Sequence, residues 1–483
     1  MKNFGNLLLA CMAALLGACA GESAGKCDAV VRIDADSVVN RGYIGNGVQW
    51  DPYALDYGQG RVEISDADWE KLYARLDFMR PAFIRVMTNT TSVVRDGRLD
   101  RMRGFEQLSH ILGYCQSRGV TVMFGDWGGS LMDARAGTVN RTLLDHAAAY
   151  VAWLVGEKGY DCIRYYNLVN EPNGFWSAAD GDFDLWAKAV CYFRGRLDAE
   201  GLAGKVELVG PDAAIWGPEE AWWVSRSRDE LGDRIGLYDI HTYPSKCTVN
   251  SGEYTRILEA YRREVPAGKK IVMGEIGFKF VEPADSLLQA ENLRRAAAHP
   301  NASTDDSQMF VYDPMYGTDM ADALFQTIHA GYSGCIAWML DDAMHFKEAP
   351  DKLKIWGFWN IFGDEIFGAG EERVRPWYYA WSLLCRTLRP GSDFFAADVR
   401  GAAGVKAVAA VNVSREPRRV RIECPGWERF RQATRYRYGE GLMRTEGDHT
   451  LLPDATGLRI DFRSGAEYDM PGESMILLTE QND

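Results

Sequence analysis

Two glutamates in this sequence each follow a short apolar run with the composition of a buried strand. Glu171 ends the run YYNLVN at residues 165–170, and Glu275 ends the run KIVMG at residues 270–274. Pro172 cannot continue a central strand, so we expect the first of these strands to end at Glu171. Side chains at the C-terminal ends of parallel strands lie where α/β barrels carry their active sites. Two carboxyl groups placed there could act as a nucleophile and a general acid/base.

The spacing of the two glutamates fits a repeating barrel. Glu275 lies 104 residues after Glu171 (275 minus 171). At roughly 35 residues for each strand and helix of a (β/α)8 barrel, this distance corresponds to three units. Asn170-Glu171-Pro172, with a second glutamate at this distance, resembles the retaining glycoside hydrolases of clan A, which carry the acid/base on strand four and the nucleophile on strand seven. The resemblance implies that Glu171 is the acid/base and Glu275 the nucleophile.

The resemblance extends to three further expected strands and covers most of residues 40–390. Arg85 lies in an apolar run where clan A enzymes carry an arginine. His241 and Tyr243 match the clan's His-x-Tyr on strand six, whose groups hydrogen-bond near the nucleophile. Trp338, on the expected eighth strand, matches the tryptophan that lies under the reactive sugar. The resemblance implies substrate-binding roles for these four side chains.

Some of these residues could tune the two carboxyl groups. A retaining glycosidase needs one ionised and one protonated carboxyl near neutral pH. Arg85 and Tyr243 could keep Glu275 ionised through an opposite charge and a donated hydrogen bond. Asn170 could bond the hydroxyl next to the anomeric carbon. Purely structural roles, an ion pair for Arg85 and a packed ring for Tyr243, stay open.

Three more residues follow expected strands near the mouth of the barrel. Trp50 ends the expected first strand, and Asp126 and Trp127 follow the third, at residues 120–124. We predict that Trp50, Asp126 and Trp127 contact the substrate. Many clan relatives carry a histidine near the position of Asp126, so the subsite for the non-reducing end stays unassigned.

Periodicity predicts the elements that must position these groups. Apolar runs bounded by glycine and proline favour strands, and apolar residues spaced three and four apart favour helices. A long segment, residues 276–332, should hold an insertion over the site. The expected strands are residues 42–50, 83–87, 120–124, 165–171, 206–209, 237–244, 270–275 and 334–340, and the expected helices are residues 65–79, 105–115, 144–155, 183–197, 254–263 and 319–329, with a last helix opened by Pro376.

After Pro390-Gly391 the pattern changes to short alternating strands broken by glycine, proline and aspartate, which predicts an all-β sandwich. Residues 30–36 also alternate, and a lone strand would leave its backbone groups unpaired, so we expect them to pair with the sandwich. The predicted fold is a (β/α)8 TIM barrel with a smaller C-terminal domain. The predicted parts are residues 1–18 as a signal peptide, 19–29 as a tether, 30–390 as the barrel and 391–483 as the sandwich.

The N-terminal residues predict export. Lys2 supplies positive charge before the short apolar run at residues 7–16. Leu16-Gly17-Ala18-Cys19 resembles the lipobox of bacterial lipoproteins, which implies cleavage before Cys19 and acylation of its thiol. We therefore expect a secreted protein that is lipid-anchored to the outer membrane, on its periplasmic face or at the cell surface. An ordinary signal peptide with a chance cysteine is the alternative.

The net charge and the histidine spacing disfavour nucleic-acid binding and a metal-dependent function. The 483 residues carry a net charge of −14 without a basic cluster, which disfavours nucleic acid as a partner. The seven histidines show no H-E-x-x-H spacing, so we expect no metal and no cofactor.

The combined prediction is a lipid-anchored retaining glycoside hydrolase that acts on a β-linked poly- or oligosaccharide. Within clan A the chain looks most like the β-xylosidase/α-iduronidase family and the cellulase family, with no choice between them. One alternative is a carbohydrate-binding lipoprotein on the same barrel that has lost catalysis, which the presence of both glutamates disfavours. Another is a non-glycosidase barrel enzyme such as a metal-dependent lyase, which the absence of ligand clusters in the sequence disfavours.

Overall fold

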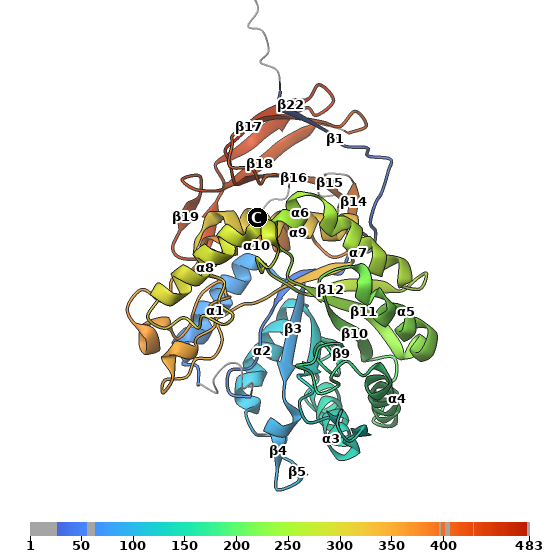
Figure 1. Cartoon of the computed structure of the whole chain (residues 1–483). Coiled ribbons are helices and arrows are strands. Elements are labelled where there is room, and N and C mark those ends of the chain that lie inside the picture. The colour runs from blue at the N-terminus through green and yellow to red at the C-terminus, as the bar shows by residue number, and fades with distance from the viewer. Residues whose placement is uncertain (1–26, 56–62, 396–397, 401–405, 428, 481–483) are drawn as a thin grey trace, which may run out of the picture.

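Eight parallel strands close into a barrel in the computed structural model (Figure 1). The structure describes all residues except 1–26, 56–62, 396–397, 401–405, 428 and 481–483. Each strand pairs with its neighbour in chain order, and the eighth pairs with the first. In chain order the strands are β2 (Gly45–Gln49), β3 (Phe83–Thr88), β6 (Thr121–Asp126), β9 (Ile163–Asn167), β10 (Glu207–Ile215), β11 (Ile235–Thr242), β12 (Lys270–Ile276) and β13 (Gly334–Ala337).

The inside of the barrel is a small separate core. Apolar side chains fill it, since the strands are buried on both faces. A second, much larger core lies between the strands and the surrounding helices. The inner core consists of Phe83, Met123, Val209, Leu237, Val272 and Ile336.

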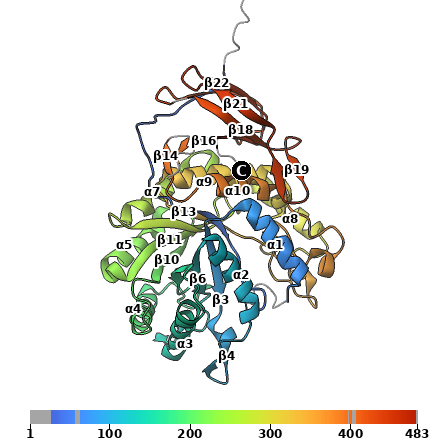
Figure 2. The ribbon, with the colours of Figure 1, turned by 180° about the vertical axis from the view of Figure 1, so that it is seen from behind.

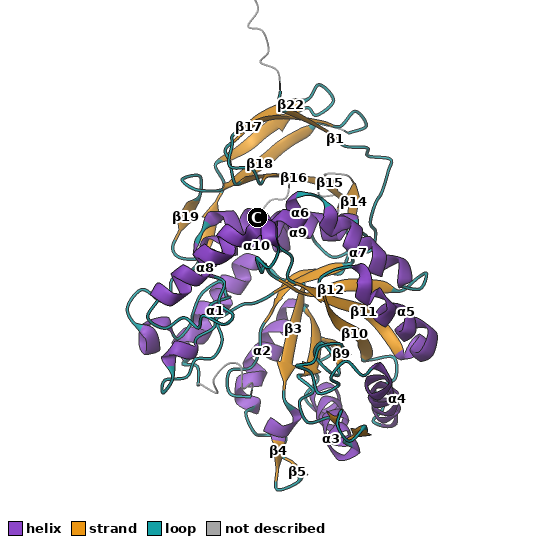
Figure 3. Ribbon diagram, viewed as in Figure 1, coloured by secondary structure: helices purple, strands orange, loops and turns teal. Residues whose placement is uncertain are grey.

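Helices cover the outside of the barrel (Figure 3). The Ser65 side chain accepts a hydrogen bond from the N–H of Asp68 and so begins the first helix, while Gly119 ends the second at φ 66°. The helices are α1 (Asp66–Met79), α2 (Phe105–Arg118), α3 (Arg141–Ala152), α4 (Phe183–Ala199), α5 (Ala221–Arg226), α6 (Lys246–Asn250), α7 (Glu253–Glu264), α8 (Ser286–Ala298), α9 (Pro314–His329) and α10 (Pro376–Thr387).

Two strands end four or more residues away from their expected ends. β9 ends at Asn167, four residues before Glu171, because the chain turns where Asn167 accepts a hydrogen bond from the N–H of Val169. β10 extends past the expected end at residue 209 to Ile215. It continues through Pro211 because a register shift against β11 occurs between Pro211 and Ala213, and such irregularities tolerate a proline.

The long segment after β12 carries additional structure, as its length predicts. Between Ile276 and β13 lie the short turn Pro283–Asp285, then α8, the turn Met309–Tyr312 and α9. Two other loops of the barrel contain hairpins whose strands are two residues long. They are β4 (Val94–Arg95) with β5 (Arg98–Leu99) and β7 (Met132–Asp133) with β8 (Thr138–Val139).

The C-terminal part is all β and packs against one side of the barrel (Figures 1 and 2). One sheet has the order β14-β15-β16-β23-β18-β21, and the other has the order β1-β17-β22. β1 (Ala29–Arg32) runs parallel to β17 and joins the second sheet. The remaining strands are β14 (Asp393–Phe395), β15 (Asp398–Arg400), β16 (Lys406–Asn412), β17 (Arg418–Glu423), β18 (Phe430–Tyr438), β19 (Arg444–Glu446), β20 (Thr450–Leu452), β21 (Ala455–Ile460), β22 (Ala466–Met470) and β23 (Ser474–Thr479).

These observations confirm the predicted fold class, a TIM barrel with a smaller all-β sandwich. Apolar side chains from both sheets, with Ile33 from the segment after β1, form the core of the sandwich. Among the described helices, none has the length and apolar character needed to cross a bilayer. Cys19, the predicted lipidation site, lies outside the described residues.

Candidate active site

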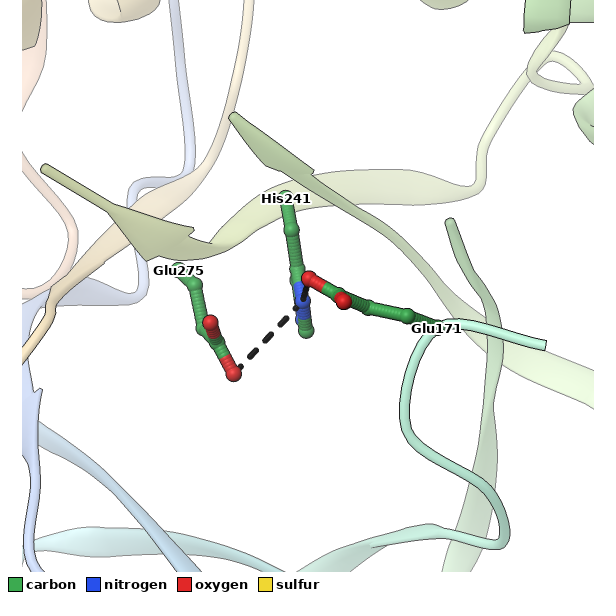
Figure 4. Close-up of side chains that lie close together, drawn as sticks. All are labelled: Glu171, His241 and Glu275. Atoms are coloured by element: carbon green, nitrogen blue, oxygen red, sulfur yellow. Dashed lines mark hydrogen bonds and ion pairs between the residues drawn. The ribbon is translucent and has the colours of Figure 1, made fainter. Parts of the chain in front are cut away.

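Glu171 and Glu275 meet at the C-terminal end of the barrel strands. Glu275 is the sixth residue of β12, and Glu171 lies in the loop after β9. The imidazole of His241, on β11, lies between the two carboxylates (Figure 4). Its Nδ1 is 3.1 Å from Oε1 of Glu171 and 3.6 Å from Oε1 of Glu275. One carboxylate oxygen of each glutamate and a ring nitrogen of His241 lie within 4.8 Å of one another.

Glu275 is buried among donors. Nη1 of Arg85 donates to its Oε1 at 2.5 Å, and the Tyr243 hydroxyl donates to its Oε2 at 2.7 Å. Burial raises the pKa of Glu275, and the positive charges of His241 and Arg85 and the Tyr243 hydrogen bond counteract part of this rise. The two donors also fix the orientation of both carboxylate oxygens.

Asp212 lies beneath the two glutamates and contacts both Arg85 and His241. Its Oδ2 accepts hydrogen bonds from Nη2 of Arg85 at 3.1 Å and from Nδ2 of Asn167 at 2.6 Å. Its Oδ1 is 3.0 Å from Nε2 of His241. Burial opposes ionisation, but the charges of His241 and Arg85 outweigh it and hold the pKa of Asp212 below its usual value.

His241 is therefore positively charged. Burial lowers the pKa of the imidazole, but the negative charges of Asp212 and Glu275 outweigh burial and raise that pKa well above its usual value. With both ring nitrogens protonated, Nδ1–H donates to Glu171 and Nε2–H points to Asp212.

Asp239, a second buried aspartate, lies on β11 with His241 and carries a proton. Burial and the charge of Asp212 raise the pKa of Asp239 well above its usual value. Gly274 on the next strand makes room for this side chain, because a Cβ there would lie 2.1 Å from Oδ2 of Asp239. A neutral Asp239 avoids a second buried negative charge beside Asp212.

The backbone at Glu171 is strained. Its φ of 48° is in the left-handed region, which a non-glycine residue adopts at a cost. The N–H of Glu171 donates to Oδ2 of Asp212 at 3.3 Å, and Nε1 of Trp176 donates to Oε2 of Glu171 at 2.7 Å. Such strain at an element's end, held by surrounding contacts, is typical of functional sites.

A pocket of about 380 Å³ opens over the two glutamates. Three tryptophans border it, with Trp338 in contact with both Trp127 and Trp356. The insertion after β12 supplies much of the remaining wall, including Lys279, whose Nζ lies 4.8 Å from the Tyr243 ring centre and 3.0 Å from Oδ1 of Asp306. The lining residues outside this insertion are Trp127, Asn170, Glu171, Tyr243, Glu275, Trp338 and Trp356.

Most of the predicted substrate-binding residues come together here. Asn170 lines the pocket, and its Oδ1 accepts a hydrogen bond from Nη2 of Arg85 at 2.7 Å. Tyr243, Trp127 and Trp338 line the same pocket. Arg85 and His241 are fully buried and contact the glutamates from below.

Four of the predicted substrate-binding residues do not line the pocket, and the prediction is corrected for them. Arg85 and His241 contact the carboxylates of the two glutamates instead, and Trp50 and Asp126 contact neither the pocket nor the glutamates. Trp50 is 1% exposed and packs against Trp69 of α1 and Tyr114 of α2, because its side chain points outward into the helix layer. Asp126 is buried and accepts hydrogen bonds from the backbone N–H groups of Thr90 and Gly128. Its carboxylate thereby orders two loops and does not face the pocket.

Sequence reasoning did not select Asp212, Trp176 or Trp356 as site residues. Asp212 comes three residues after the expected end of the fifth strand, so its place near that strand end was the available signal. Trp176 and Trp356 lie in irregular loops after β9 and β13, where hydrophobic periodicity does not predict which way a side chain points.

Two sets of side chains have the composition of a metal site. Glu171, His241 and Glu275 form one, and Asp212, Asp239 and His241 form the other. Arg85 contacts Glu275 and Asp212, so a fixed positive charge already neutralises an acid in each set. The imidazole of His241 belongs to both sets, and its two ring nitrogens already contact Glu171 and Asp212. This donor arrangement does not fit a cation.

No protein-family model matches the sequence, and a search of curated proteins finds no match. Solved structures do match over nearly the whole chain. A monomeric β-xylosidase from Caulobacter crescentus CB15 has 13% identity and a TM-score of 0.60, covering 93% of this chain and 99% of its own.

Two further solved structures match to a similar extent. A glycoside hydrolase family 30 subfamily 8 xylanase from Clostridium acetobutylicum has 12% identity and a TM-score of 0.60, covering 93% of this chain and 98% of its own. A glucosidase from Croceicoccus marinus has 10% identity and a TM-score of 0.61, with the same coverage. At these identities the similarity establishes that the chain shares the fold of these glycoside hydrolases.

Proposed function

We propose that this chain is a retaining glycoside hydrolase that cleaves β-linked glycans, with Glu275 as nucleophile and Glu171 as acid/base. The observation that carries the proposal is the pair of glutamates with carboxylate oxygens within 4.8 Å of each other at the mouth of the barrel. Retaining glycosidases hold their two carboxyl groups about 5–5.5 Å apart, and inverting enzymes hold them about 6.5–9.5 Å apart.

In the first step, an oxygen of Glu275 attacks the anomeric carbon while Glu171 donates a proton to the leaving glycosidic oxygen. The bond between the anomeric carbon and that oxygen breaks, and a glycosyl ester forms on Glu275. In the second step, Glu171 takes a proton from a water molecule that attacks the anomeric carbon, and the carboxylate of Glu275 is released. Two inversions give net retention.

The surrounding residues support this division of roles. Arg85 and Tyr243 donate to the two oxygens of Glu275 and favour its ionised form, which the attack requires. Asn170, beside the acid/base, reaches the pocket and could bond the hydroxyl next to the anomeric carbon. Trp338 offers an aromatic face to the sugar at the cleavage point.

A mechanism-based fluorosugar tests the proposal. Because the solved structures with this fold include a β-xylosidase, a xylanase and a glucosidase, 2-fluoro derivatives of xylose and glucose with a good leaving group are the first probes. We expect a peptide containing Glu275 to gain the mass of the fluoroglycosyl group. Labelling of another residue, or products with inverted configuration, would contradict the assignment. Glycan binding without turnover would favour a carbohydrate-binding protein that has lost catalysis.

We further propose that the chain is exported and anchored through a lipid on Cys19. The support is the order of charged, apolar and small residues before Cys19, which is that of a lipoprotein signal.

A further inference from the structure

Three of the four exposed phenylalanine and tryptophan side chains in the described part of the chain gather next to Glu171. Phe175 is 83% exposed, Trp176 is 47% exposed and Trp216 is 54% exposed. The ring centre of Trp176 lies 4.9 Å from that of Phe175 and 6.0 Å from that of Trp216. Exposed aromatic residues in contact with one another indicate a binding surface, because isolated exposure is the norm for a soluble protein.

This aromatic cluster lies outside the pocket over the nucleophile. Phe175 and Trp176 belong to the loop after β9, and Trp216 follows β10 directly. None of the three lines the pocket that contains Glu275. The cluster is joined to the site through Trp176, whose Nε1 donates to Oε2 of Glu171, while His241 contacts the other oxygen of this carboxylate.

The loop after β9, which carries Phe175 and Trp176, is hydrogen-bonded to the end of β10, which leads into Trp216. Nδ2 of Asn173 donates to the carbonyl of Ala214 at 2.7 Å, and the N–H of Ala214 donates to Oδ1 of Asn173 at 2.9 Å. The Trp176 ring packs on the backbone of Gly174, where a Cβ would lie 2.3 Å from Cε2 of the indole. The planes of Trp176 and Trp216 stand at 83° to each other. The Trp176 ring and the backbone that leads into Trp216 are therefore fixed by contacts within the protein.

We propose that Trp216, with Trp176 and Phe175 beside it, forms a subsite for a pyranose ring of the leaving group. This inference rests on the proposed glycosidase function. An acid/base protonates the glycosidic oxygen from the side on which the leaving group departs. Trp176 contacts the acid/base and not the nucleophile, so the cluster lies on that side of the bond. Pyranose rings with equatorial substituents expose a flat face of C–H groups, which pack on an indole.

The subsite determines the substrate class. A leaving group that occupies it must be a sugar, so the substrate is a β-linked oligo- or polysaccharide with at least one pyranose beyond the cleaved bond. A glycoside with a small leaving group gains nothing from Trp216. The contribution of the cluster is therefore the difference in rate between a sugar leaving group and a small one.

The test compares two leaving groups in three variants. Wild type is first assayed on β-1,4-linked tetrasaccharides of xylose, glucose, mannose and galactose, and on the glycosyl fluoride of the sugar that it releases. The Trp216→Ala variant should lose about tenfold more kcat/KM on the tetrasaccharide than on the fluoride, the size of one aromatic contact. Trp216→Phe, which keeps a flat ring, should restore most of this difference.

Trp222→Ala provides the matched control. Trp222 is 42% exposed, close to Trp216 in exposure, but its ring packs against Trp223 on α5. Its ratio of kcat/KM between the two substrates should equal that of wild type. An equal loss on both substrates in Trp216→Ala would overturn the subsite while leaving the glycosidase function intact. If wild type hydrolysed no tetrasaccharide and no fluoride, the proposed function itself would fail, and the subsite with it.

Discussion

Asp212 and His241 form a buried ion pair, with Oδ1 of the aspartate 3.0 Å from Nε2 of the imidazole. Both side chains are almost fully buried. His241 contacts Glu171 through its other ring nitrogen, so the charge of Asp212 acts on the acid/base through the imidazole. Asp212 is thus a positioning residue that keeps His241 charged and holds its Nδ1–H toward Glu171.

The first prediction concerns this pair. Asp212→Asn removes the negative charge and should lower the pKa of His241 toward its usual value, because the largest of the charges that raise this pKa is lost. The imidazole of the variant should therefore lose its proton at a lower pH than in wild type. NMR of histidine-labelled protein measures the pKa directly. His329, the last residue of α9, has its pKa lowered by burial and serves as the control that should titrate as in wild type. An unaltered His241 pKa would contradict the positioning role.

The second prediction concerns the acid limb of the pH profile of kcat/KM, which depends on the ionisation of Glu275. Burial raises the pKa of Glu275, and the Tyr243 hydrogen bond lowers it again in part. Since the nucleophile must be ionised, Tyr243→Phe should raise the pKa of Glu275 and move the acid limb of kcat/KM to higher pH. A pH profile on a glycosyl fluoride measures this shift.

Tyr238→Phe is the control for that shift. Tyr238 lies on β11, the strand that ends directly before Tyr243, and is fully buried, but its hydroxyl has no hydrogen-bond partner among the described residues. The acid limb of this variant should match that of wild type. A profile of Tyr243→Phe that coincides with the control would show that the hydroxyl does not stabilise the ionised nucleophile.

The third prediction separates the roles of the two glutamates. Glu171→Ala should lower kcat on a substrate with a poor leaving group by about 10²- to 10⁴-fold, the usual contribution of a general acid/base. Glu275→Ala removes the nucleophile, and azide should restore turnover by attacking the anomeric carbon directly. NMR should then detect a glycosyl azide of inverted configuration. A retained azide product from the Glu275→Ala variant would mean that the assignments are exchanged.

The periodicity of the sequence predicted the strands and helices, and the spacing of the two glutamates with the resemblance to clan A predicted their arrangement as a barrel. The capping pattern at Ser65 and the apolar spacing of α1 determine that helix locally. Residues 30–36 were expected to join the C-terminal domain because a lone strand would lack partners, and Ala29–Arg32 pairs with β17.

The end of the fourth strand was less predictable. The composition of residues 165–170 favours an extended chain, and only the side-chain contacts of Asn167 with Val169 and Asp212 determine that β9 stops early. The contact with Asp212 joins residues that are far apart in sequence, so no local pattern encodes it.

The sequence also did not predict which way a side chain points at the end of a strand. Trp50 and Gln49 are neighbours, yet Oε1 of Gln49 accepts a hydrogen bond from Arg85 beneath the site while Trp50 faces the helices. The alternation of a strand predicts that neighbours point to opposite sides, but it does not predict which of them faces inward. The aromatic cluster could not be predicted for the same reason, since it depends on loops that meet only in the fold.

The fourth prediction concerns location. Cys19→Ser removes the thiol that a lipoprotein acyl chain would modify. If the chain is lipid-anchored, the variant should move from the membrane fraction to the soluble exported fraction. Leu8-Leu9-Ala10-Cys11 also resembles a lipobox, but almost no apolar run precedes it, so Cys11→Ser should fractionate as wild type does. Equal membrane retention of both variants would contradict acylation at Cys19.

The last prediction concerns the contact between the barrel and the C-terminal domain. Tyr438 of β18 is fully buried, and its hydroxyl donates to the carbonyl of Pro314 at 2.7 Å. A Cβ at Gly317 on α9 would lie 2.2 Å from that hydroxyl oxygen. Gly317→Ala should therefore push the two domains apart and lower the free energy of unfolding by about 1–3 kcal/mol, the usual cost of overpacking. Gly113→Ala on α2, where a Cβ meets nothing within 4 Å, should instead stabilise the protein by up to about 1 kcal/mol through helix propensity. Thermal melting distinguishes the two, and a Gly317→Ala variant as stable as Gly113→Ala would mean that the sandwich does not pack rigidly on the barrel.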